Sequence, residues 1–174
     1  MGRRATKGAL IATGLALAAL VTVAAAGRAR PAPGPGDVFP IAAGKPGQPV
    51  LAWVFRTEDY LTCAAPAAEL RRVQASHPEV AVVAVAVGTT HQGWVPAFFR
   101  RERVKAELAF LDRGAYRDRF GAARTPAMYL LKDGRIERIF FAGDSESRVA
   151  GRLAAVRPAL RQALAGQGGT GEAQ

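Results

Sequence analysis

The stretch Val50-Leu-Ala-Trp-Val-Phe55, continued by Arg56-Thr-Glu-Asp-Tyr-Leu-Thr-Cys-Ala-Ala-Pro66, decides how this chain folds. Its first part is a short apolar run, which predicts a buried strand, and an amphipathic helical pattern follows it. Cys63, the single cysteine among 174 residues, therefore stands where a strand leads into a helix. Backbone N–H groups and the helix dipole can stabilise a thiolate at such a position, which would make Cys63 a nucleophile. The alternative is that Cys63 is a small buried hydrophobe.

Strand and helix patterns alternate along the rest of the folded region. The predicted strands are Pro49–Arg56, Val80–Val87, Ala106–Leu111, Ala127–Lys132 and Arg135–Ala142. The predicted helices are Ala64–Ser76, Trp94–Val104, Ala115–Phe120 and a last one from Asp144 or Ser145 to Ala165, kinked at Pro158. This order predicts an α/β fold in which a mixed central sheet has helices on both faces.

The first 26 residues have the pattern of an export signal. A basic segment that contains Arg3, Arg4 and Lys7 precedes the uncharged residues 8–26, which end in three alanines. Two interpretations remain open: a cleaved signal peptide, or an uncleaved signal anchor that spans the membrane, which we favour. The basic residues keep the N-terminus inside, so the folded part faces the periplasm or is secreted into it.

The composition divides the rest of the chain into three parts. Residues 27–47 are rich in proline and glycine, which predicts a semi-extended linker. Residues 48–165 form the predicted folded domain, and the polar, glycine-rich residues 166–174 form a tail that we expect to be disordered.

The net charge of +10 does not indicate nucleic-acid binding. Five of the 24 basic residues precede residue 31, where no acid occurs, so the remaining chain carries only about half of that charge. The other basic residues are scattered, without the aromatic interleaving that single-stranded nucleic acid requires. His77 and His91 lack metal-ligand spacing, and no motif for a metal, nucleotide or haem cofactor is present. Glu58 and Asp59 are expected to be solvated loop acids.

The element order and a second motif resemble the thioredoxin superfamily. That motif is Phe120-Gly-Ala-Ala-Arg-Thr-Pro-Ala-Met-Tyr-Leu-Leu-Lys-Asp-Gly-Arg-Ile136, in which a Thr-Pro pair precedes a strand and an Asp-Gly hairpin. The resemblance covers residues 48–165 and is nearest to the exported thiol–disulfide interchange and alkyl hydroperoxide reductase-like branch. It implies a thioredoxin-like fold with a cis Thr125–Pro126 peptide bond beside the active-site thiol.

The chain departs from this family at its redox motif, because CxxC needs two cysteines. If Cys63 is the first, Pro66 stands in the resolving position and Glu69-Leu70 matches a Glu-Leu pair common in the family. If Cys63 is the second, Tyr60 replaces the nucleophile, and the distance from Phe55 matches better. We favour the first register. The residue three before Cys63 is Tyr60 rather than threonine or serine, so conventional peroxiredoxin chemistry is not expected.

The resemblance implies thiol–disulfide exchange by a single thiol at Cys63, with Thr125, Pro126, Tyr60 and Pro66 lining a substrate groove. The partners would be protein thiols and disulfides or glutathione. A single thiolate can form a mixed disulfide with them, but without a second thiol it cannot release that mixed disulfide. The alternative is a redox-inactive binding or scaffold module that uses the same groove.

Overall fold

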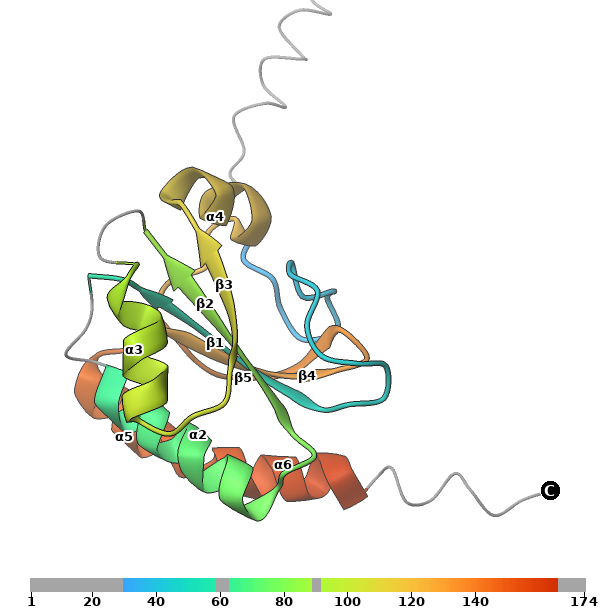
Figure 1. The fold of residues 1–174 in the computed structure, drawn as a ribbon. Helices are drawn as coiled ribbons and strands as arrows, with labels where there is room; N and C mark the ends of the chain where they lie inside the picture. The colour runs from blue at the N-terminus through green and yellow to red at the C-terminus, as the bar shows by residue number, and fades with distance from the viewer. Residues whose placement is uncertain (1–29, 59–62, 89–91, 166–174) are drawn as a thin grey trace, which may run out of the picture. The chain divides into compact units, whose positions relative to one another are not determined.

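The computed structural model describes residues 30–58, 63–88 and 92–165, and its centre is a mixed sheet. The five strands lie in the order β3-β2-β1-β4-β5 (Figure 1). Strands β1, β2 and β3 run parallel, whereas β4 and β5 are antiparallel to their neighbours. The strand bounds are β1 Val50–Arg56, β2 Ala81–Val87, β3 Glu107–Leu111, β4 Ala127–Lys132 and β5 Arg135–Ala142. The predicted mixed α/β sheet is confirmed.

Helices cover both faces of this sheet, as predicted. The buried residues of α2, α3, α5 and α6 form one apolar cluster, and those of α4 belong to a second cluster. The helix bounds are α2 Ala64–Ser76, α3 Trp94–Arg101, α4 Arg113–Phe120, α5 Glu146–Leu153 and α6 Val156–Ala165. Strand β1 separates the two clusters, because alternate side chains of a strand point to opposite faces of the sheet.

A buried carboxylate joins two of the helices. Glu69 of α2 is 3% exposed, and its Oε1 lies 3.0 Å from Nε of Arg157 in α6. Its Oε2 lies 3.1 Å from Nη1 of Arg72 on the same helix. Both carboxylate oxygens therefore have a guanidinium partner, which a buried charge requires.

The packed part of the chain begins before residue 48. Val38 forms a bridge with Arg135 of β5, and the Phe39 N–H donates to the Gly134 carbonyl. Phe39 is 3% exposed, and its ring centroid lies 5.5 Å from those of Phe120 and Tyr129. The compact unit begins at Pro31, so part of the segment predicted to be a linker contributes to the core.

Helix α3 ends three residues earlier than predicted. Arg103 has a φ of 57°, in the left-handed region, and its N–H donates to the Arg100 carbonyl at 3.1 Å. The Val104 N–H donates to the Phe99 carbonyl at 3.0 Å. This pair of bonds closes a helix C-terminus, normally with glycine at the left-handed position. The sequence gives no such signal here because the position holds arginine.

The single last helix predicted from Ser145 to Ala165 is instead two helices. α5 begins after Ser145, and α6 begins at Val156. Pro158 lies in the first turn of α6, where the N–H that proline lacks has no partner within the helix. The proline therefore fits the start of a new helix. In a continuous helix its ring would clash with the Ala154 carbonyl, so the structure has a break one turn before Pro158 where the sequence predicted a kink.

The predicted export segment 1–26 and the predicted tail 166–174 lie outside the described residues. Within the described part of the chain, no helix is long and apolar enough to span a bilayer.

Replacing Phe39 with alanine tests whether this N-terminal segment belongs to the core. We expect Phe39→Ala to lower the free energy of unfolding by about 3 kcal/mol, because a buried ring is lost and leaves a cavity. Denaturant unfolding of the full chain measures the change. The neighbouring Val38 is 63% exposed, so Val38→Ala is the matched control with little expected effect. Equal stability of both variants would contradict the packing described.

Candidate functional site

Cys63 lies immediately before α2 and is completely buried. It is the N-cap residue of the helix, with 0% of its surface exposed, and it belongs to the apolar cluster that also contains Phe55 and Leu70. Pro66 is also buried, in the first turn of α2, where its missing N–H needs no helical partner. The structure thus confirms the predicted strand-to-helix junction and places the thiol inside it.

The Thr125–Pro126 pair lies at the carboxyl end of β1. Its peptide bond is cis, as the resemblance implied, and both residues are partly buried. Val54 of β1 pairs with Ala127, which places Pro126 beside the end of that strand. The Pro126 carbonyl accepts a hydrogen bond from the Gly143 N–H at 2.8 Å, so the loop is fixed to the segment after β5.

Hydrogen bonds join the ends of the three parallel strands. The Thr57 N–H donates to the Val87 carbonyl at 2.9 Å, and the Gly88 N–H donates to the Leu111 carbonyl at 2.8 Å. Gly88 has a φ of 128°, and a Cβ there would lie 2.5 Å from Oγ1 of Thr57. Glycine is therefore required for both the backbone conformation and the close approach.

A cavity of about 220 Å³ lies beside these strand ends. It is lined by Arg56, Val87, Arg113, Tyr116 and Thr125. Tyr116 of α4 belongs to the second apolar cluster, whereas Cys63 belongs to the first. Thr125 therefore contributes to a cavity on the α4 side, while the thiol packs with the helices of the opposite face.

Solved structures of other proteins resemble this fold, whereas the comparisons with family models and curated proteins find no match. A bacterioferritin comigratory protein from Xanthomonas campestris, whose alkyl peroxide reduction was studied, aligns with a TM-score of 0.51 and 14% identity, over 67% of this chain and 79% of that one.

Two thiol–disulfide proteins align equally well. A putative thiol:disulfide interchange protein DsbE from Chlorobium tepidum has a TM-score of 0.50 and 18% identity, over 71% of this chain and 97% of that one. The thioredoxin domain of a thiol-disulfide oxidoreductase from Bacteroides vulgatus has a TM-score of 0.50 and 12% identity, over 70% and 96%. The chain has a thioredoxin-like fold.

The thioredoxin-like fold brings some of the predicted site residues to one end of the sheet. Thr125 and Pro126 follow the expected geometry, and Cys63 and Pro66 begin α2. Tyr60 lies outside the described residues. The sequence did not indicate the cavity-lining residues Arg56, Arg113 and Tyr116, because β1 and α4, which supply them, are far apart along the chain and share no motif.

Glu58 lies between two arginines at the mouth of this site rather than being a simply solvated acid. Its Oε1 accepts from Nη2 of Arg113 at 2.9 Å, and its Oε2 lies 3.6 Å from Nε of Arg56. Burial raises the pKa of Glu58, but its backbone hydrogen bond and the two arginines outweigh this and lower the pKa overall. The carboxylate is therefore charged at neutral pH and holds the two cations near the cavity.

Tyr116 provides a neutral hydroxyl in the same cavity. Burial raises the pKa of Tyr116, with a further contribution from Tyr129, so the phenol stays protonated. Its hydroxyl donates to the Ala123 carbonyl at 3.2 Å. Tyr116 therefore fixes the loop before Thr125 and does not serve as a base.

The Glu58 arrangement predicts a specific pH dependence of stability. A carboxyl whose folded-state pKa is lowered contributes stability above its unfolded pKa, near 4.5, and loses it as the pH falls through the folded value. We expect Glu58→Gln to cost up to about 1 kcal/mol at pH 7, and nothing at a pH below the folded-state pKa.

Denaturant unfolding of the unchanged protein and of the Glu58→Gln variant, from pH 7 to a pH below the folded-state pKa of Glu58, measures the difference in stability. The matched control is Glu137→Gln, since Glu137 of β5 is exposed and has no ion pair among the described residues. A Glu58→Gln cost that does not change with pH would show that the carboxylate charge is not what stabilises the loop.

Proposed function

We propose that the chain is an exported, membrane-tethered protein with a thioredoxin-like fold that binds polypeptide partners beside Thr125 and Pro126 without dithiol turnover. In this proposal Cys63 occupies the second position of the former CxxC motif, and Tyr60 occupies the first. One observation carries it: the Cys63 thiol has no exposed surface.

The burial of Cys63 favours this register for a mechanistic reason. In dithiol exchange, the first thiolate attacks a substrate disulfide, forms a mixed disulfide and releases one substrate thiolate. The second thiolate then attacks that mixed disulfide, forms the protein disulfide and releases the other substrate thiolate. The first step requires contact with a substrate outside the protein, whereas the second can proceed from the interior. A buried Cys63 therefore fits the second role, and no thiol fills the first.

Export and membrane attachment rest on the sequence of residues 1–26. A basic start followed by 19 uncharged residues has the length and charge layout of a signal anchor or signal peptide. Cleavage would leave a periplasmic protein, and retention would leave a membrane-tethered one. Either form would present the folded unit to extracytoplasmic proteins.

The second candidate function is thiol–disulfide exchange by the single thiol of Cys63. Its position at the N-terminus of the 13-residue helix α2 favours it, because the helix dipole stabilises a thiolate. The thiolate would attack glutathione disulfide or a protein disulfide, form a mixed disulfide and release one thiolate. An external thiol would then be needed to restore Cys63.

Restoring a second cysteine distinguishes the two registers. We expect Tyr60→Cys to give the full chain insulin-reducing turnover with dithiothreitol as reductant, because the introduced thiol would attack and Cys63 would release. Pro66→Cys is the matched variant, which restores a CxxC motif in the other register, and we expect it to stay inactive. Insulin precipitation measures the reduction.

Cys63→Ser in the Tyr60→Cys background is the control and should abolish turnover. Activity of Pro66→Cys but not of Tyr60→Cys would place Cys63 first and overturn the proposed register. Rapid formation of a Cys63–glutathione mixed disulfide by the unchanged chain, detected by mass spectrometry, would favour the second candidate function instead.

A further inference from the structure

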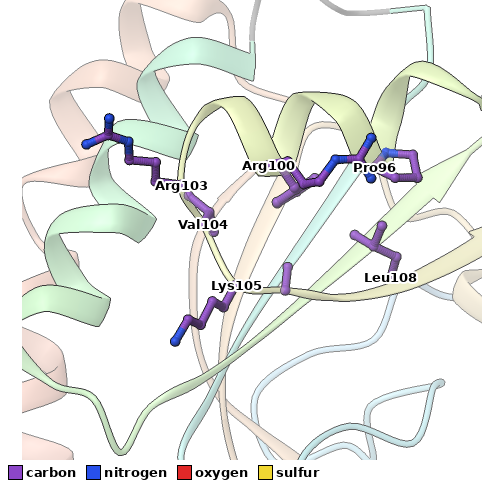
Figure 2. Close-up of a pocket in the computed structure, with 8 residues that line it drawn as sticks. Pro96, Arg100, Arg103, Val104, Lys105 and Leu108 are labelled. Atoms are coloured by element: carbon purple, nitrogen blue, oxygen red, sulfur yellow. The ribbon is translucent and has the colours of Figure 1, made fainter.

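A groove between α3 and β3 shares no lining residue with the cavity beside Thr125. It has a volume of about 490 Å³, and we call it the α3–β3 groove. Its apolar lining includes Phe99, Val104, Ala106 and Leu108, and Leu108 points from β3 toward the helix in Figure 2. Its size is that of a site for a small ligand or a few side chains.

The groove runs beside an open strand edge. Strand β3 is an edge strand of the sheet, and no described strand pairs with its outer side. Phe110, two residues after Leu108 and on the same face of the strand, is 39% exposed. An unpaired edge offers backbone N–H and C=O groups to an extended segment of another chain.

Basic side chains surround this groove. Arg100, Arg103 and Lys105 all line it and are exposed, and none pairs with a carboxylate among the described residues. Arg103 and Lys105 also line an adjoining hollow of about 380 Å³, to which α2 contributes Arg71. No acidic residue lines either hollow.

The position of Lys105 is fixed by its backbone. The Gln74 side chain accepts from the Lys105 N–H at 3.0 Å and donates to its carbonyl at 2.6 Å. The ammonium group is left at the surface, and Figure 2 shows it directed away from α3. These bonds fix the backbone from which the Lys105 side chain extends.

We propose that the outer edge of β3 and the α3–β3 groove bind an extended acidic segment of a partner protein. The segment adds to the sheet as a strand beside β3 and places an apolar side chain in the groove. Its carboxylates lie near Arg100 and Lys105. This surface is separate from Cys63, and the inference does not depend on the proposed function.

The charges favour this occupant over a second copy of the chain. Self-association across β3 would bring Arg100, Arg103 and Lys105 of one copy toward the same basic residues of the other. Like charges at an interface oppose association, whereas an acidic partner is attracted and oriented by them. Strand addition also uses the backbone edge, which a lipid acyl chain cannot do.

Fluorescence anisotropy with a labelled peptide of alternating glutamate and valine tests the proposal, using the full chain in dodecyl maltoside. We expect binding that the double charge reversal Arg100→Glu and Lys105→Glu weakens by at least about tenfold. The double reversal Arg117→Glu and Arg119→Glu, at two exposed arginines of α4, changes the net charge equally; it is the matched control and should bind as the unchanged chain does. Thermal unfolding confirms that each variant is folded.

Two N-methylated peptides test strand addition itself. Methylation of every second amide blocks hydrogen bonds on one edge of the peptide, so one of the two alternate patterns should abolish binding and the other should not. Equal binding of both patterns would overturn strand addition. If the chain binds phosphatidylglycerol vesicles more strongly than the peptide, and the double variant loses this binding, the surface is a membrane-binding surface. If the chain forms concentration-dependent dimers that the double variant does not form, the surface is a self-association surface. Either result overturns the proposal.

Discussion

The burial of β1 on both faces is the constraint on which the rest of the structure depends. Leu51, Trp53 and Phe55 belong to one apolar cluster, and Val50, Ala52 and Val54 belong to the other. All six residues are at most 2% exposed. A strand with no polar face must be covered on both sides, so helices and the segment around Phe39 are required above and below the sheet.

This constraint also explains why Cys63 and Thr125 have different surroundings. The chain leaves β1 at its carboxyl end and enters α2, whose apolar side packs on the Trp53 and Phe55 face and includes the thiol. Thr125 returns to the same end of the sheet but lines a cavity beside α4, with Arg56 and Arg113 around Glu58. The thioredoxin-like geometry is thus retained at a site whose thiol lies in the interior.

The sequence predicted the strands and the Thr125–Pro126 conformation because each has a local signal: an apolar run, a turn or a family motif. It did not predict the end of α3, because Arg103 adopts a conformation usually marked by glycine. The packing of Phe39 depends on partners about 80 and 90 residues away, Phe120 and Tyr129. The cavity beside Thr125 likewise combines separate elements, so no spacing along the chain could indicate it.

The reaction of Cys63 with Ellman's reagent, measured in the full chain at increasing denaturant concentration, tests most directly whether the thiol belongs to the core. A thiol in the core should react very slowly in the folded protein, and the free energy needed to expose it should fall with denaturant concentration as the free energy of global unfolding does. Fast reaction without denaturant, at a rate that denaturant hardly changes, would place the thiol at the surface and contradict its burial in the core.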